Sequence, residues 1–276
     1  RKFALFAAAF VALGSPLWSV SADALWTHGA THALLAGMLL AIATQRMGAA
    51  AVFGGLSILF RPHLVVPVLV IGAFQKDWRS RLAISAGALF GVAVLAGYSM
   101  WIFGQPLPAA GYPVGQVVQG MPLQSPSAFA ANVVDWLFDP KRGVLIMVPA
   151  VLLAIPKLRP AWTAAPGWVR VGAVAGVAYA FAQIGLIRAS GGNYFFGHRT
   201  TIEALVLASP LMVLSINEWT RELRSPGRVL LLVVLGYSLL VHAYGAMVGV
   251  PPGLKEVLME EQQEVRDMLQ DGAPGR

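Results

Sequence analysis

Six long apolar runs dominate this sequence, and they constrain its fold more than any other feature. Each is about as long as the roughly 17–25 residues that an α-helix needs to cross a bilayer. They cover residues 3–20, 28–44, 82–103, 168–187, 200–217 and 229–249. Charged residues make up only 12% of the chain, about half of their usual share in soluble domains. The chain is therefore predicted to be an all-α, polytopic helical membrane protein.

Three further apolar runs are too short to cross a bilayer as straight helices. They cover residues 48–60, 63–74 and 143–156. The first two flank Arg61-Pro62 and predict a short helical hairpin with a polar apex inside the protein body. Irregular backbone at membrane depth needs cover from protein or from a water-filled cavity. All these runs together predict about nine membrane-embedded segments.

Two amphipathic segments lie outside the apolar runs. Residues 127–140 place four apolar side chains on one helical face and predict a helix that lies in the membrane interface. These side chains are Phe129, Val133, Trp136 and Leu137. Residues 251–276 predict an amphipathic helix or tail, which we treat as separate from a transmembrane domain over residues 1–250.

The distribution of basic residues predicts the orientation of the chain. If the N-terminal end lies in the cytoplasm and the runs alternate, the inner side receives the scattered basic residues. These are Arg46, Lys76, Arg79, Arg81, Lys157, Arg159, Arg170, Arg221, Arg224 and Arg228. Short cytoplasmic loops usually carry such an excess, so the high pI does not require a nucleic-acid partner. The chain begins with Arg1 instead of Met, and we expect sequence upstream of it.

A second group of basic residues forms compact clusters on the predicted outer side. They are His28, Arg61 with His63, Lys141 with Arg142, and His198 with Arg199. Cations placed against the usual bias need another reason, and a phosphate or carboxylate ligand would supply one. Local ion pairing and snorkelling of the long side chains to the interface are the competing explanation.

The segment "GGNYFFGHRTTIEA" at residues 191–204 carries the richest of these clusters. Glu203 follows Arg199 by one helical turn, so an i,i+4 pair could hold this arginine toward an anion. Tyr194 belongs to a group of aromatic residues suited to contact a sugar or a prenyl chain. We therefore predict that Arg199, Glu203 and Tyr194 contribute to a substrate-binding site.

Evidence for a metal or catalytic site is weaker. His28 and His32 share a helical face and could ligate a metal, but no third ligand lies nearby in the sequence, so no metal site is predicted. Asp23 is a weak candidate for a catalytic base, and an N-cap role is the simpler explanation. Cysteine is absent, which excludes thiolate chemistry. We expect no cofactor and leave a divalent cation open.

Four segments together resemble blocks of bacterial C-type glycosyltransferases. They are "LWSVSADALWTHGATHALLAGMLLAIATQR", "GGLSILFRPHLVVPVLVIGAF", "LFDPKRGVLIMVPAVLLAIP" and "GGNYFFGHRTTIEALVLASPLM". The corresponding family patterns are Leu-Trp-x-His-Gly, Arg-Pro after a short helix, Ser-Pro-x-Arg-Gly-Leu, and Gly-Gly-x-x-x-Gly-x-Arg. His198 stands where proline is common in the family, and Asp139 stands where serine is common.

The resemblance implies a multi-pass enzyme of the bacterial inner membrane with an outward-facing site. It would transfer a hexose or pentose, with inversion, from a polyprenyl-phosphate donor to a glycan, lipid or protein acceptor. His28, Arg61 and Arg199 are the residues that the resemblance places at the donor phosphate. The family's catalytic acid belongs to a first outer loop that would precede Arg1.

Two other functions remain open from the sequence alone. A transporter or flippase for an anionic lipid-linked or sugar substrate would use similar cationic clusters at a broken helix. A non-catalytic membrane scaffold would need none of them. An acidic residue in an upstream outer loop would favour the enzyme, and a pseudo-symmetric second half would favour the transporter.

Overall fold

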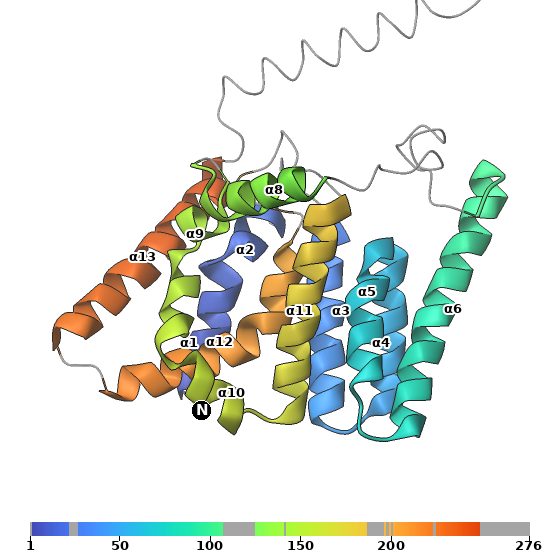
Figure 1. Ribbon diagram of the computed structural model, residues 1–276, viewed down its shortest axis with the longest axis horizontal. Helices are drawn as coiled ribbons and strands as arrows, with labels where there is room; N and C mark the ends of the chain where they lie inside the picture. The colour runs from blue at the N-terminus through green and yellow to red at the C-terminus, as the bar shows by residue number, and fades with distance from the viewer. Residues whose placement is uncertain are drawn as a thin grey trace, which may run out of the picture.

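The computed structural model describes residues 2–21, 27–106, 125–140, 142–186, 196, 199, 201–222 and 225–248, and all regular structure in these ranges is helical (Figure 1). The first half contains α1 (Lys2–Leu13), α2 (Pro16–Ser21), α3 (Thr27–Ala43), α4 (Met47–Phe60), the 3₁₀-helix η1 (Pro62–Leu64), α5 (Val65–Ala73) and α6 (Trp78–Phe103). The second half contains α8 (Pro126–Phe138), α9 (Val144–Met147), the 3₁₀-helix η2 (Pro149–Lys157), α10 (Leu158–Ala164), α11 (Gly167–Leu186), α12 (Ile202–Glu222) and α13 (Ser225–Val248).

Four of these helices are long and apolar enough to cross a membrane, namely α6, α11, α12 and α13. The predicted spans 82–103, 168–187, 200–217 and 229–249 fall on them. The helices α1, α3, α4 and the η1–α5 segment are apolar but shorter. The chain is thus an all-α protein with several apolar helices of membrane-spanning length, whereas nine membrane-embedded segments remain a prediction.

Two predicted runs are not single α-helices. The run 3–20 breaks between α1 and α2, where Gly14 and Ser15 precede Pro16. Proline lacks an N–H group and disfavours helical backbone in the residue before it. The run 143–156 forms the four-residue α9 and then η2, which begins at Pro149 and contains Pro156. In both cases proline interrupts a segment that hydropathy alone reads as continuous.

The predicted hairpin around Arg61 is present. Helix α4, η1 and α5 form it, and α4 packs between α3 and α6. Glycines bring α4 and α6 into close approach, because a Cβ atom at Gly87 would collide with the carbonyl oxygen of Ala51. A Cβ atom at Gly91 would collide with the carbonyl oxygen of Gly55 in the same way. Small residues commonly allow such backbone contact between membrane helices.

Helix α8 lies across one end of the bundle, roughly perpendicular to the long helices (Figure 1). None of its residues is fully buried, and Ser125 caps its N-terminus by accepting a hydrogen bond from the Ala128 N–H. The half-buried side chains include the predicted apolar face, with Phe129 and Trp136 turned toward the bundle. The predicted helix is therefore present with its apolar face toward the bundle, and its place in the membrane interface stays a prediction.

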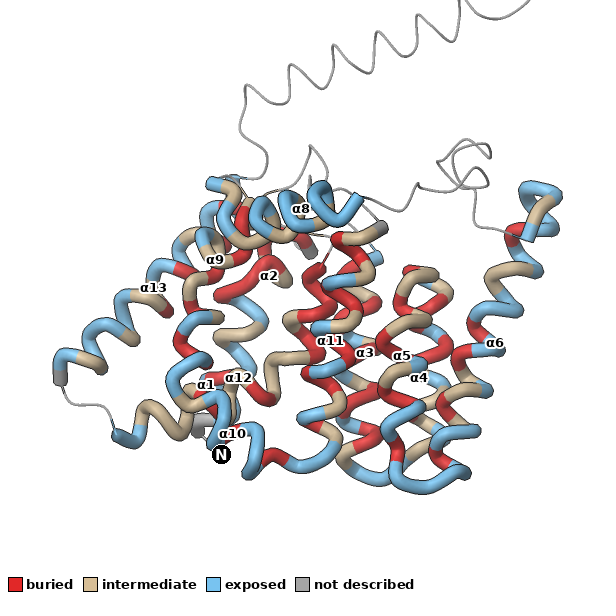
Figure 2. The backbone as a smooth tube through the Cα atoms, in the orientation of Figure 1, coloured by how far each residue is buried: buried red, intermediate tan, exposed pale blue. Residues whose placement is uncertain are grey.

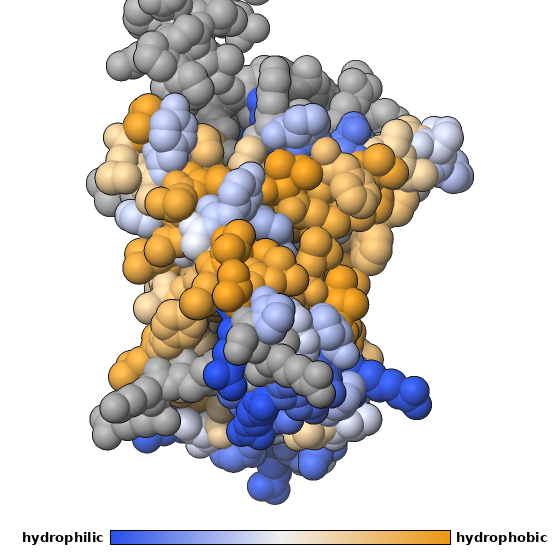
Figure 3. Space-filling view, turned by 90° about the vertical axis from the view of Figure 1, so that its left-hand side faces the viewer, coloured by the Kyte–Doolittle hydropathy of each residue, from blue (hydrophilic) through white to orange (hydrophobic). Residues whose placement is uncertain are grey.

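Burial and hydropathy match a membrane environment. Buried residues concentrate on α3, α4, α5, α11 and α12, whereas the outer helices α6 and α13 are largely exposed (Figure 2). Apolar side chains such as Leu232 and Leu240 are exposed on α13. An apolar band separates more hydrophilic ends on the face drawn in Figure 3. The exposed apolar surface of α6 and α13 is therefore suited to contact lipid.

The helix connections that carry the scattered basic residues gather at one end of the bundle (Figure 1). The N-terminal end of α1, the α3–α4 turn with Arg46 and the α5–α6 turn with Lys76 lie there, as does α10. The α4–η1–α5 turn and the beginnings of α3 and α12 lie toward the opposite end, where α8 also lies. The predicted segregation of inner and outer residues thus corresponds to two opposite ends. The predicted tail at residues 251–276 lies outside the described residues.

Candidate functional site

Glu203 forms the centre of a buried polar cluster. It lies in the first turn of α12 and its residue exposure is 0%. Its Oε1 accepts a hydrogen bond from Arg61 Nη1 at 2.6 Å, and its Oε2 accepts one from the Tyr179 hydroxyl at 3.0 Å. A buried charge is tolerated when a partner and further hydrogen bonds compensate it. We call His28, His32, Arg61, Tyr179 and Glu203 the Glu203 cluster.

Arg61 reaches this cluster because the chain turns sharply at the end of α4. Arg61 has extended backbone (φ −145°, ψ 100°), and its N–H still donates to the carbonyl of Ser57. Pro62 follows at the start of η1 and prevents α4 from continuing. Arg61 is only 8% exposed, so the predicted apex lies inside the protein body.

The histidines come from two elements. His28 and His32 lie one turn apart on α3, and both are buried. His28 Nδ1 lies 2.9 Å from Glu203 Oε1, and the Thr31 hydroxyl donates to the same oxygen at 3.3 Å. His63 stacks on Tyr179 with ring centroids 5.8 Å apart. The predicted candidates His28, Arg61, His63 and Glu203 are therefore brought together.

Arg199 precedes α12 and lies within electrostatic range of His28. The sequence predicted that Glu203 orients Arg199. The Glu203 carboxylate makes hydrogen bonds with other residues. The two carboxylate oxygens contact His28 on α3, Arg61 at the end of α4 and Tyr179 on α11. The start of α12 is also held by α8, because Trp136 Nε1 donates to Thr201 Oγ1 at 2.8 Å.

Arg142 is the remaining predicted residue that the structure describes, and it is not part of the cluster. Arg142 lies in the turn after α8, where its backbone N–H donates to Asp139 Oδ1 at 2.9 Å. Asp23, Lys141, Tyr194 and His198 lie outside the described residues.

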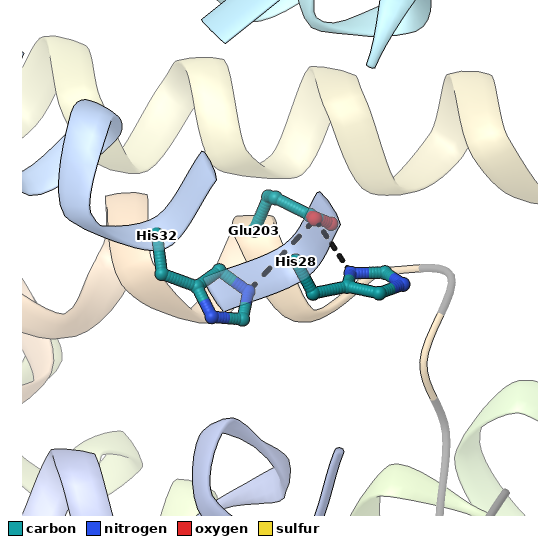
Figure 4. Close-up of side chains that lie close together, drawn as sticks. All are labelled: His28, His32 and Glu203. Carbon is teal, nitrogen blue, oxygen red and sulfur yellow. Dashed lines mark hydrogen bonds and ion pairs between the residues drawn. The ribbon is translucent and has the colours of Figure 1, made fainter. Parts of the chain in front are cut away.

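The prediction of no metal site considered only ligands close to His28 and His32 in the sequence. His28 and His32 lack a third ligand nearby in the sequence, but α12 brings Glu203 between them. One ligand atom from each of the three residues lies within 4.8 Å of the others (Figure 4). The local sequence could not reveal this, because 175 residues separate His28 from Glu203. These three residues are the ones in the cluster that could hold a metal ion.

Two candidate residues on α11, Tyr179 and Gln183, were not predicted from the sequence. Tyr179 bonds Glu203, and Gln183 lies one turn further along the helix, fully buried. Its amide oxygen and nitrogen both lack a hydrogen-bond partner in the part of the chain that the structure describes. Polar residues one turn apart inside an apolar span are a usable sequence signal, because such residues are costly in hydrocarbon.

Unpaired polar atoms mark the surroundings of the Glu203 cluster. Among the described residues, His32 Nε2 and His63 Nε2 are buried without a hydrogen-bond partner, as is the Gln183 amide. Buried polar groups are nearly always satisfied, and exceptions call for an explanation such as a ligand. The cluster therefore has unused capacity to bind a polar group.

An open apolar cavity of about 620 Å³ reaches the cluster. It lies between α1, α3 and α12, and His32 lines it at the end nearest Glu203. Most of the other lining side chains are alanine or larger apolar residues, including Ala36, Leu39 and Ala43 along one face of α3. Its size falls within the roughly 300–1,000 Å³ typical of small-molecule sites.

Comparison of the chain with protein-family models, curated proteins and solved structures gave no match. The chemistry is therefore inferred from the cluster itself. Among the described residues, Arg61 within the cluster and Arg199 within electrostatic range of it are two cations beside one carboxylate, Glu203. Together with the unpaired imidazole and amide groups, they suit an anionic ligand that also carries hydroxyl groups.

Proposed function

We propose that this chain is part of a membrane glycosyltransferase that transfers a sugar from a polyprenyl-phosphate donor to a glycan, lipid or protein acceptor. The observation that carries the proposal is a buried arginine, held by Glu203, next to the end of an apolar cavity. A polyprenyl-phosphate sugar has the matching parts, namely an apolar chain, an anionic phosphate and a polar sugar.

Arg61 would neutralise the donor phosphate. Its Nη1 contacts Glu203 and His28, and a guanidinium has five N–H donors in a planar fork, which leaves other N–H groups for phosphate oxygens. Arg199 would add a second positive charge from the start of α12. Fixed donors of this kind stabilise the charge that develops on a leaving group.

The reaction requires a base for the acceptor hydroxyl. The acceptor oxygen attacks the anomeric carbon, the bond from that carbon to the phosphate oxygen breaks, and the proton passes to a carboxylate. Polyprenyl phosphate leaves on the opposite face of the sugar, which gives inversion. Glu203 is a positioning residue in this scheme, because its carboxylate already accepts hydrogen bonds from Arg61 and Tyr179. The base in this scheme would be a carboxylate other than Glu203, and Asp23 is the weak candidate in this chain.

The apolar cavity suits the prenyl chain. The face of α3 from His32 to Ala43 lines it over twelve residues, and the eleven steps between them span about 16 Å of helix. The alanines of α1 and α3 leave room for a thin, flexible chain beside α12. A phosphate attached to that chain would then lie near His32 and the Glu203 cluster.

The proposed fold and orientation follow the resemblance to C-type glycosyltransferases. About nine membrane-embedded segments would include the α4–η1–α5 hairpin. The end with the scattered basic residues would face the cytoplasm of a bacterium, as the positive-inside tendency favours. The Glu203 cluster would then face outward from the inner membrane, beneath α8.

The test uses the full-length protein in lipid vesicles with a panel of polyprenyl-phosphate hexoses and pentoses. Removal of one charge-stabilising donor typically costs about 10²–10³-fold in rate, so we expect Arg199→Ala to reduce sugar transfer by that amount. Arg170→Ala is the matched control, because Arg170 is exposed at the opposite end of α11. Both variants should insert normally in the membrane.

Transfer that is unchanged in Arg199→Ala would contradict the proposed donor site. The transporter alternative predicts a different product. In that case the lipid-linked sugar reaches the other leaflet with its sugar still attached, and no free polyprenyl phosphate forms. That result would replace the enzyme proposal.

A further inference from the structure

Three potential metal ligands converge inside the Glu203 cluster. His28 and His32 extend from one face of α3, and Glu203 extends toward both from the first turn of α12 (Figure 4). All three residues are buried. Two imidazole nitrogens and one carboxylate oxygen are also the donor set of zinc sites that keep a fourth position open.

His32 supplies an independent sign of a ligand. Its side chain is 7% exposed, and its Nε2 lies 3.8 Å from Glu203 Oε1. That distance exceeds a hydrogen bond, and Nε2 has no other hydrogen-bond partner among the described residues. Burying an imidazole nitrogen in this way is costly unless something binds it. The same nitrogen is directed at the carboxylate that His28 contacts (Figure 4).

The guanidinium group of Arg61 lies among these ligand atoms. Arg61 Nη1 is 2.5 Å from His28 Nδ1 and 2.6 Å from Glu203 Oε1, and those two atoms are 2.9 Å apart. If Nδ1 accepts a hydrogen bond from Arg61 Nη1, it carries no proton to donate to Oε1. If Nδ1 instead carries the proton, it faces the N–H of Arg61. A metal ion would accept lone pairs from both atoms and remove this conflict.

The spacing of the ligand atoms fits a small divalent ion. Zinc–ligand bonds of about 2.0–2.1 Å in a tetrahedron place neighbouring ligand atoms roughly 3.3 Å apart. The distances from Glu203 Oε1 to His28 Nδ1 and His32 Nε2 are 2.9 Å and 3.8 Å. All three ligand atoms lie within 4.8 Å of one another, so tetrahedral binding would require side-chain rotations that adjust these separations. Imidazole ligands favour Zn²⁺ over Mg²⁺ or Ca²⁺, which prefer oxygen.

We propose that His28, His32 and Glu203 form a Zn²⁺ site, and that Arg61 occupies the same place as an alternative cation. Two cations cannot share Glu203 Oε1 and His28 Nδ1, so metal binding turns the Arg61 guanidinium out of the cluster. The fourth zinc position then remains for a water or an anionic oxygen. This inference does not depend on glycosyl transfer.

The test is zinc titration of untagged, full-length protein in detergent after removal of metal by a chelator. Calorimetry should show one Zn²⁺ bound per chain. Loss of an outer-shell partner already costs about 10–100-fold in metal affinity, so His32→Ala, which removes a ligand, should weaken binding by more than ~100-fold. His242→Ala is the matched control, because His242 is a buried histidine on α13 that contacts Ser19. It should bind zinc like the wild type.

Arg61→Met tests the competition directly. It keeps an apolar stem and removes the alternative cation, so zinc affinity should rise above that of the wild type. If Arg61→Met does not accumulate, the zinc affinities of His32→Ala and His242→Ala test the proposed site, because both variants retain Arg61. Equal zinc affinity in those two variants, or no saturable binding by the wild type, would overturn the proposal. The titration contains no sugar donor, so a failed transfer assay leaves this result unaffected.

Discussion

The guanidinium nitrogen Nη1 of Arg61 lies 2.6 Å from the carboxylate oxygen Oε1 of Glu203, although 142 residues separate the two in the chain. The pair joins the end of α4 to the start of α12 and is almost completely buried. Breaking such a pair leaves one charge uncompensated in a medium that solvates it poorly. The pair therefore couples the two halves of the bundle as well as forming the candidate site.

Removal of either partner alone should destabilise the protein strongly. We expect Arg61→Ala or Glu203→Ala to lower the free energy of unfolding by about 3–5 kcal/mol. The double variant should lose less than the sum of the two, because no unpaired charge remains. Unfolding in detergent followed by circular dichroism measures both effects. Lys157→Ala is the control, since it breaks the more exposed pair with Glu222 and should cost at most about 1 kcal/mol.

The hydroxyl of Tyr179 should contribute to stability through Glu203. Tyr179→Phe removes the donor to Oε2 and keeps the ring that stacks on His63. Hydrogen bonds to charged groups contribute about 1.5–3 kcal/mol, and we expect a loss in that range. The same change at Tyr98, which is exposed on α6, should alter stability little. Equal effects at both positions would show that the Tyr179 hydroxyl is not bonded to the carboxylate.

Close contact between α4 and α6 should make Gly87 intolerant of a methyl group. A Cβ atom there would meet the backbone of Ala51, which cannot move aside as a flexible side chain would. Gly87→Ala should therefore lower the free energy of unfolding by about 1–3 kcal/mol, as overpacking does. Gly97→Ala in the same helix has open space around it, so it should be neutral or stabilising by up to about 1 kcal/mol. Destabilisation of similar size at both sites would argue against the helix contact.

Asp77 should make the start of α6 sensitive to acid. Its carboxylate accepts hydrogen bonds from the Ser80 hydroxyl at 2.6 Å and the Ser80 N–H at 2.8 Å. These bonds lower the pKa of Asp77 below its ordinary value of 3.8. The stabilisation is present above that ordinary value and is lost as the pH falls through the lowered folded value.

Asp77→Asn should therefore lower the melting temperature at pH ~6 and reduce its dependence on pH down to about pH 3. Melting curves of both proteins across this range provide the measurement. Parallel pH profiles for the wild type and Asp77→Asn would show that this cap does not contribute to acid sensitivity.

Much of the helical architecture was predictable from local sequence. Runs of apolar residues identify α6, α11, α12 and α13, because every turn of a membrane-spanning helix must satisfy its backbone within itself. The Arg61-Pro62 step predicted a buried apex, since its flanking helices are too short to reach the surface. Hydropathy failed where proline acts, at Pro16 and Pro149, because it measures transfer to lipid and not the loss of a backbone donor.

The candidate site was only partly predictable. His28, Arg61, His63, Arg199 and Glu203 could each be selected as polar residues that are costly in an apolar setting. The contacts between these residues could not be predicted, because they depend on how α3, α4, α11 and α12 pack.

The sequence by itself determined that this chain forms apolar helices, where proline interrupts them, and which polar residues demand a partner, because these properties depend on neighbouring residues. Only the tertiary structure decided that Glu203 pairs with Arg61 and meets His28, His32 and Tyr179. A buried carboxylate binds whichever donors the packed helices bring within hydrogen-bond reach, and that distance is set by the whole bundle.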